Sequence, residues 1–272
     1  MNRLFVGYKR AFISSNSYLN TIKKKFNIKK IGYSGTLDPF ASGILVLASG
    51  SYTRLLNHIT LEPKVYRATL WLGAKSESLD ITNKVEVKMV SEFSLDSINI
   101  VLDSLIGRIN YIPPKFSAKK INGIRAYKLA RSGESVELKE CKMEIFDIKV
   151  LNYNHPFLSF EVSVSKGAYI RSLGEIVASK LGVNGILSNL IRIKEGDFSF
   201  EGYKFLDPLS LIKYPKIDLN SYYNDVKNGK EITLKQSYKN TTYIANFEDF
   251  FSIIRINDYK NVEYILNRIP KC

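Results

Sequence analysis

The chain has 272 residues, of which 45% are hydrophobic and 24% charged, so it can bury a sizeable core as an ordinary globular protein. Its 40 Lys and Arg against 26 Asp and Glu leave a net charge of +14, which favours a polyanionic partner such as nucleic acid, although a Lys-rich proteome would explain part of this excess. Two cysteines exclude a disulfide framework, and no apolar run is long enough for a membrane span, so we expect a cytoplasmic protein.

The N-terminal segment is predicted to form a strand over residues 3–7 and then a helix that ends at Phe26. Ser15 or Ser17 is a suitable N-cap, and apolar residues recur at helical spacing at positions 19, 22 and 26. Lys23, Lys24 and Lys25 fall on the other side of this helix. A solvated helix face and a phosphate-binding face explain this run of lysines equally well.

Residues 31–51 contain the most informative side chain, Asp38, which is the only acidic residue between Met1 and Leu61 among nine basic ones. A surface that faces a polyanion should lose carboxylates, so a carboxylate retained there indicates a specific task. Glycines and Pro39 around Asp38 predict a tight loop, and the apolar run 44–48 predicts a buried strand after it. Asp before Pro is also a common turn former, so turn former and reactive carboxylate are equally supported by spacing alone.

Further along the chain, a short helix is expected over residues 52–59, and alternating patterns then predict strands over residues 64–73, 141–152 and 158–165. A helix is expected over 94–105, with an apolar stripe that includes Leu95 and Leu105, and another follows residue 166 and ends at Leu181. Residues 207–272 give weaker signals, with a short helix near 209–212. No metal site is expected, because His58 and His155 lie far apart and no ligand-spaced cluster surrounds either of them.

Residues 111–133 mix two prolines, six basic residues and three aromatic residues. This interleaving is typical of proteins that bind single-stranded or loop RNA, because cations follow phosphates while rings accept bases. An exposed loop and helix without an RNA role is the alternative interpretation.

The string Gly32 to Gly43, GYSGTLDPFASG, resembles the G-H-T-G-T-L-D-P-x-A-S/T-G motif of the TruB family of tRNA pseudouridine synthases. The resemblance runs to about Phe200 and covers a K-x-Y motif followed by L-G-x-x-S-x-S-x-D (residues 64–80), a P-P-x-F-S-A segment (113–133) and G-A-Y-I-R-S-L (167–173). Two departures stand out. Tyr33 occupies the position where the family usually has His, and residues 8–15, YKRAFISS, keep the Lys and a Ser pair of the family's D-K-P-x-G-x-T-S but lack its Pro and Gly.

The resemblance implies a catalytic set of three residues: Asp38 as the nucleophile, Arg171 as its counter-ion, and Tyr66 as a base-stacking ring and proton-transfer group. Without the resemblance, Tyr66 would be assigned to the core, and Arg171 to a helix end or to solvent. Charge chemistry supports the pair, since a desolvated carboxylate needs a partner such as Arg to stay ionised. The substrate-binding residues that the resemblance implies are Tyr33, Lys64, Tyr169, Leu190, Lys119, Arg125 and Arg131.

The expected fold class is therefore α+β: a pseudouridine synthase fold with a mixed, mostly antiparallel sheet, flanking helices and an RNA-gripping insertion at about 111–140. Residues 1–205 would form the catalytic domain, and residues 206–272 a small, reduced PUA-like RNA-binding domain. The expected function is isomerisation of uridine 55 in the tRNA T-loop by a monomer, without a cofactor or an obligate protein partner. The alternatives are a guide-RNA-dependent synthase and an RNA-binding or tRNA-folding chaperone. A glycoside hydrolase is disfavoured, since no second carboxylate is identifiable beside Asp38.

Overall fold

The computed structural model describes residues 2–117, 119–121, 123–132 and 138–271. Its main sheet has eight strands in the order β1-β3-β12-β4-β11-β10-β7, with β2 paired to β3. The strands are β1 (Arg3–Lys9), β2 (Ile31–Tyr33), β3 (Ser42–Ser49), β4 (Lys64–Leu72), β7 (Gly107–Tyr111), β10 (Cys141–Asn154), β11 (Phe157–Val164) and β12 (Gly185–Glu195). β3 and β12 run parallel, and the other neighbouring strands in this order run antiparallel. The prediction of a mixed, mostly antiparallel sheet is confirmed.

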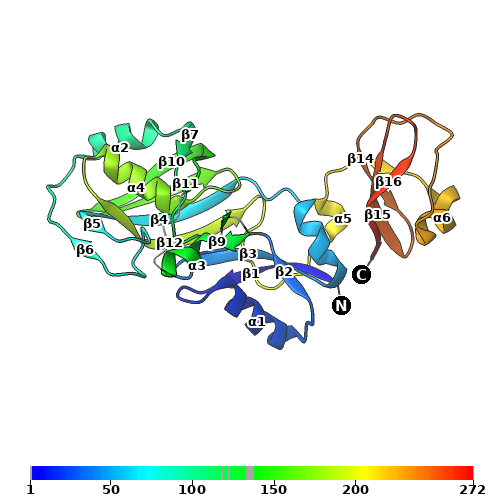
Figure 1. Cartoon of the computed structure of the whole chain (residues 1–272), viewed down its shortest axis with the longest axis horizontal. Coiled ribbons are helices and arrows are strands. Elements are labelled where there is room, and N and C mark those ends of the chain that lie inside the picture. The colour runs from blue at the N-terminus through cyan, green and yellow to red at the C-terminus, as the bar shows by residue number, and fades with distance from the viewer. Residues whose placement is uncertain (1, 118, 122, 133–137, 272) are drawn as a thin grey trace.

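Helices flank this sheet at both ends (Figure 1). The longer ones are α1 (Ser15–Phe26), α2 (Leu95–Asp103) and α4 (Ile170–Lys180), and a 3₁₀ helix, η1 (Gly50–Asn57), follows β3. The N-cap of α1 is Ser14, whose hydroxyl accepts from the Ser17 amide at 3.0 Å. The predicted N-caps, Ser15 and Ser17, were both wrong, because the helix begins one residue after Ser14. Ser15 is buried inside the first turn and uses its hydroxyl elsewhere.

The alternation predicted for residues 64–73 is confirmed in β4, where Tyr66, Ala68, Leu70 and Leu72 are all buried. The predicted pairing of β10 with β11 is also confirmed. The stripe predicted for α2 was wrong in one position: Leu95 is 53% exposed at the first residue of the helix, while Leu105 is buried just after its end. A helix terminus extends beyond the sheet that it covers, so periodicity fails first at that position.

The continuous apolar run in β3 is explained by burial on both faces of the strand. Leu45 and Leu47 point into the main core, while Ile44 and Val46 point into a second core on the opposite face. That second core includes residues of η1 and of the C-terminal region. β3 is therefore clamped from both sides, which makes it a rigid mount for the loop that precedes it.

Two smaller pairs of strands project from the main sheet. One is formed by β5 (Ala74–Lys75) and β6 (Glu86–Val87). The other is formed by β8 (Lys120–Ile121) and β9 (Ile124–Arg125), and α3 (Ala126–Arg131) follows it. The second pair and α3 belong to the segment predicted as an RNA-gripping insertion.

The C-terminal region forms its own four-stranded sheet in the order β13-β14-β15-β16, which lies to the right of the main sheet in Figure 1, near the N-terminus of the chain. Its elements are α5 (Pro208–Leu211), β13 (Lys216–Ile217), η2 (Asn220–Tyr222), α6 (Tyr223–Asn228), β14 (Thr242–Asn246), β15 (Phe250–Ile256) and β16 (Val262–Pro270). One face encloses a separate core that contains Val226 and Ile254, and the other contributes Phe251 and Ile253 to the second core beneath β3. The small sheet is thus packed against the main one through apolar residues.

Candidate active site

The loop that carries Asp38 joins β2 to β3 and is fixed by contacts on both sides of the aspartate. On one side, the buried Ser15 hydroxyl donates to the Leu37 carbonyl at 3.0 Å and accepts from the Leu37 amide at 3.1 Å. On the other, the buried Lys9 ammonium donates to the carbonyls of Pro39 and Ala41. These bonds hold the backbone of Asp38 in one position.

Gly43 is required where the loop enters β3. It has φ +119°, and a Cβ at this position would lie 2.3 Å from the Arg192 carbonyl oxygen on the neighbouring strand β12. β3 and β12 pair in parallel where Ser42 lies opposite Ile191 and Gly43 lies opposite Arg192. Any side chain at position 43 would push the two strands apart there. The glycine therefore sets the close approach of the two strands beneath the loop.

Arg171, in the first turn of α4, forms a two-point ion pair with Asp38. Its Nε lies 2.9 Å from Oδ2, and its Nη2 donates to Oδ1 at 2.9 Å. The arginine side chain is 2% exposed, whereas the aspartate side chain keeps 27% of its surface exposed. A carboxylate has about four lone-pair positions, so each oxygen retains one for a substrate on its exposed side.

Three further groups lock the Arg171 guanidinium. Its Nη1 donates to the Ser78 carbonyl at 2.7 Å and to Asp80 Oδ2 at 3.2 Å, and its Nη2 donates to the Phe116 carbonyl at 2.9 Å. Asp80 is itself 3% exposed, and its Oδ1 accepts from the Ser78 hydroxyl and from Thr82. Asp80 is thus fully engaged as a support for Arg171 rather than available for chemistry.

Burial raises the pKa of the Asp38 carboxyl above its ordinary value, and the charge of Arg171 opposes this while that of Asp80 adds to it. Arg171 favours the ionised form, but Asp38 takes up a proton at a higher pH than a solvated aspartate does. A desolvated, oriented carboxylate of this kind is suited to act as a nucleophile.

The raised pKa predicts the acidic limb of the pH profile. Because only ionised Asp38 can attack, kcat/KM should fall as the pH decreases through this raised pKa, above the value of about 3.9 for an unperturbed aspartate. Single-turnover rates measured between pH 4 and 8 would show the limb, with RNA binding followed in parallel as the control. A rate that stays constant down to pH 4 would contradict the prediction.

The structure brings Asp38 and Arg171 together, and it places the other implied residues around them in different environments. Tyr66 and Leu190 are 7% and 4% exposed and belong to the main core. Tyr169 directly precedes α4; its ring lies 6.3 Å from that of Tyr111, and burial raises its pKa. Tyr33 is the last residue of β2, at the start of the catalytic loop, and its side chain is partly exposed. Its hydroxyl lies 3.4 Å from the Thr36 hydroxyl.

The family resemblance implies that Lys64 binds the substrate, and the structure shows what its ammonium contacts within the protein. Lys64 is 7% exposed, and its Nζ lies 2.7 Å from Glu195 Oε1. Glu195 also accepts from the Ser34 hydroxyl at 2.6 Å, while Arg192 donates to the Gly35 carbonyl at 3.0 Å. Lys64 therefore belongs to a buried ionic network beneath the catalytic loop.

Loss of the Glu195 charge should destabilise the fold. Burial alone would raise the pKa of Glu195, but Arg192 and Lys64 hold it below the ordinary value, so the carboxylate is ionised at neutral pH. Glu195→Gln would leave two buried cations without their counter-ion, at a cost of about 3 kcal/mol in the free energy of unfolding measured with urea. Glu161→Gln, which breaks partly exposed pairs with Arg67 and Lys149, is the matched control and should cost less than about 1 kcal/mol. Equal losses in the two variants would refute the assignment.

The basic residues predicted in the insertion differ in environment. The Lys119 ammonium is 2.8 Å from Cys141 Sγ, so it is partly engaged with β10. Arg125 is exposed as the N-cap residue of α3. The side chain of Arg131 lies outside the described residues.

Sequence reasoning missed three supporting residues: Lys9, Asp80 and Glu195. Lys9 was counted with the basic surface, yet it is fully buried, and burial lowers its pKa to about 8. Asp80 was quoted as part of a motif but given no role. The available signal for Asp80 was its spacing from two serines: the Ser78 hydroxyl donates to its carboxylate, and the Ser76 hydroxyl donates to its backbone carbonyl.

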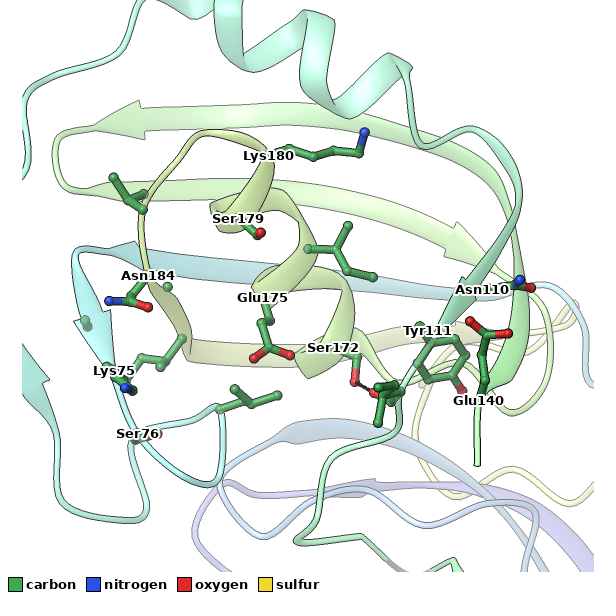
Figure 2. Close-up of a pocket in the computed structure, with 17 residues that line it drawn as sticks. Lys75, Ser76, Asn110, Tyr111, Glu140, Ser172, Glu175, Ser179, Lys180 and Asn184 are labelled. Carbon is green, nitrogen blue, oxygen red and sulfur yellow. Dashed lines mark hydrogen bonds between the residues drawn. The ribbon is translucent and has the colours of Figure 1, made fainter. Parts of the chain in front are cut away.

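A pocket of about 560 Å³ lies against α4 (Figure 2). Ser172, Glu175 and Ser179 line it from one face of the helix, and Glu175 points into it. The Ser172 hydroxyl donates to the Ile112 carbonyl at 2.8 Å and ties α4 to the start of the insertion. Asp38 is not among the residues that line this pocket.

Comparison with solved structures defines the class of this protein. The chain superimposes on a Cbf5-Nop10-Gar1 complex with a TM-score of 0.67 and 19% identity, covering 99% of this chain and 84% of that one. An archaeal box H/ACA sRNP Nop10-Cbf5 complex gives a TM-score of 0.64 and 18% identity, covering 98% of this chain and 85% of that one. The fold is that of the pseudouridine synthases.

Sequence comparison is more specific. The model of the TruB family pseudouridylate synthase N-terminal domain matches residues 23–170. A tRNA pseudouridine synthase B of Helicobacter hepaticus is 52% identical over 98% of this chain and 95% of its own length. One of Campylobacter jejuni is 48% identical over the whole of both chains. The chain belongs to the TruB family of pseudouridylate synthases, as the motifs predicted.

Proposed function

We propose that this protein is a tRNA pseudouridine synthase that isomerises uridine 55 in the T-loop, with Asp38 as the nucleophile. The observation that carries the proposal is the Asp38–Arg171 pair, in which a buried guanidinium orients a carboxylate that is still 27% exposed. Full-length similarity to relatives named tRNA pseudouridine synthase B supports the substrate class.

The reaction breaks the bond between C1′ and N1 of the uridine and forms a bond between C1′ and C5. If Asp38 attacks C1′, N1 leaves as the uracil anion, the free base rotates, and C5 then bonds to C1′ and displaces the Asp38 carboxylate. If Asp38 attacks C6, the C1′–N1 bond breaks while the base is held by Asp38, the base rotates, C5 bonds to C1′, and the C6–O bond then breaks to release the carboxylate. On either route N1 takes up a proton and the proton on C5 is finally lost to solvent, so the reaction is an isomerisation. Arg171 keeps the carboxylate ionised and aimed during these steps. We assign stacking on the base and proton transfer to Tyr66, and contact with the nucleotide to Tyr33, Tyr169 and Leu190.

Extrusion of the base from a folded loop costs a few kcal/mol, which RNA contacts elsewhere must supply. We propose that Lys119, Arg125 and Arg131 of the insertion provide phosphate contacts, and that residues 206–272 form a small RNA-binding domain of PUA-like type beside the catalytic domain 1–205. The net charge of +14 favours this binding at low salt.

In the described part of the chain, no helix has the length and hydropathy of a membrane span. We propose that the protein acts in the cytoplasm as a monomer.

Tritium release from uracil-5-tritiated tRNA transcript tests this function, because only formation of the C1′–C5 bond liberates the label. The purified chain alone should release tritium from wild-type transcript and not from a transcript with cytidine at position 55. Release only after addition of a guide RNA or a partner protein would favour the guide-dependent alternative, which the fold shared with Cbf5 complexes keeps relevant. Binding without release under either condition would favour a tRNA-folding chaperone.

A further inference from the structure

Phe12 combines two properties that are unfavourable for an ordinary surface residue. Its side chain is 70% exposed, and its backbone has φ +63°, in the left-handed region that favours glycine. Its neighbour Arg10 is also exposed. In the segment YKRAFISS, Phe12 stands at the position where the family pattern has Gly. The chain therefore keeps a large aromatic ring where a glycine would fit the backbone without strain.

The conformation of this loop is imposed by buried contacts at both of its ends. The Lys9 ammonium donates to the carbonyls of Arg10 and of Ile13, the latter at 2.8 Å, so it closes the loop over residues 10–13. Ser14 caps α1, and Ser15 is buried against Leu37. Phe12 thus sits at the exposed tip of a loop whose backbone cannot relax, which is typical of strain retained for a functional reason.

The same contacts tie the loop that carries Phe12 to the loop that carries the nucleophile. Lys9 bonds the carbonyls of Pro39 and Ala41 as well as those of its own loop, and Ser15 bonds Leu37. The Phe12 loop is therefore tied to the catalytic loop immediately before and after Asp38. No acidic residue other than Asp38 occurs in the first 61 positions, which include both loops, so this segment suits a polyanionic ligand.

We propose that Phe12 is a substrate-binding residue that stacks on an unpaired base of the RNA loop next to the nucleotide that reacts with Asp38. Proteins that recognise RNA loops commonly stack unpaired bases on exposed aromatic rings. The exposed phenyl ring of Phe12 can stack on a base, and the exposed Arg10 cation, two residues earlier, can pair with a phosphate. This proposal rests on the proposed function, since it takes a T-arm RNA as the ligand.

The test measures dissociation constants for a T-arm stem-loop in the Asp38→Asn background, where no turnover occurs. Phe12→Gly and Phe12→Leu should each weaken binding about 5- to 100-fold, whereas Phe12→Tyr should bind as the parent does. 2-Aminopurine, placed in turn at each unpaired loop position, should show at one position a quenching on binding that the Leu variant loses. Ile100→Ala, which removes a 69% exposed apolar side chain on α2, is the matched surface control and should change nothing.

A stability measurement separates stacking from structural damage. Phe12→Gly relieves the left-handed backbone, so its melting temperature should rise by about 2–4 °C while its RNA affinity falls. With Asp38 restored, KM should rise more than kcat falls. Unchanged affinity in Phe12→Gly, or parent-like affinity in Phe12→Leu, would overturn the proposal. If the wild type releases no tritium, the proposed function is refuted instead. The dissociation constants of the Phe12 variants relative to the parent would still decide the role of Phe12.

Discussion

Asp38→Asn should abolish pseudouridine formation while leaving both the fold and tRNA binding intact. Asparagine has the same shape but cannot form a covalent bond to the sugar or base, so the rate should fall by at least about 10⁴-fold, as expected for loss of a nucleophile. Tritium release at equal protein concentration measures the loss, and a filter-binding assay with the same transcript measures the retained affinity. Asp103→Asn, an exposed carboxylate at the end of α2, is the matched control and should retain full activity.

The same substitution should not destabilise the protein. The raised pKa of Asp38 means that folding disfavours its charged form, since burial outweighs the pairing with Arg171. A neutral amide removes this cost, while Asp80 remains as the counter-ion of Arg171 at 3.2 Å. We expect the free energy of unfolding to stay within about 1 kcal/mol of the wild type or to rise, as at other active sites that trade stability for activity. Residual tritium release above one-hundredth of the wild-type rate would rule Asp38 out as the nucleophile.

The parts of this molecule that the sequence predicted are those that depend on local pattern. Alternation in residues 64–73 depends on the period of a strand, and it predicted which face of β4 is buried. The glycines and the proline around Asp38 predicted a tight loop followed by a buried strand. The structure has that strand, β3, which begins at Ser42 and is buried from Gly43 to Ser49. The partnership of Asp38 with Arg171 needed the family motif, because 133 positions separate the two residues in the chain.

The parts that the sequence did not predict depend on long-range burial of polar groups. Lys9 and Lys64 look like surface lysines, yet 0% and 7% of their surfaces are exposed. Lys9 is buried because four backbone carbonyls surround its ammonium, and Lys64 because Glu195 lies 131 positions away in sequence but opposite it in the β4–β12 register. A basic residue therefore does not mark an RNA-binding surface until its burial is known. A small C-terminal domain was predicted from the family resemblance, but the order of its strands was not, because their pairings form between segments far apart in the chain.

Arg171→Lys should cause the second large effect, although it preserves the charge. The guanidinium distributes its contacts over three nitrogens: Nε and Nη2 reach the two oxygens of Asp38, and Nη1 reaches Asp80 and the Ser78 carbonyl. A lysine ammonium is one nitrogen with three donors and cannot reproduce this planar, two-sided arrangement. Asp38 should then lose its fixed orientation, and kcat should fall about 10²- to 10³-fold with a smaller change in KM. Single-turnover tritium release at saturating enzyme would measure this loss.

The pH profile distinguishes a positioning role for Arg171 from a purely structural one. Removing the two-point contact weakens the interaction that favours ionised Asp38, so the acidic limb of the variant should move to higher pH than in the wild type. A merely destabilised enzyme would lose amplitude without moving the limb. Arg67→Lys is the control, because Arg67 is 56% exposed and pairs with Glu161 on the outer surface of the sheet; neither rate nor limb should change. An unshifted limb in Arg171→Lys, with activity near that of the wild type, would mean that Asp80 and the loop contacts alone orient the carboxylate.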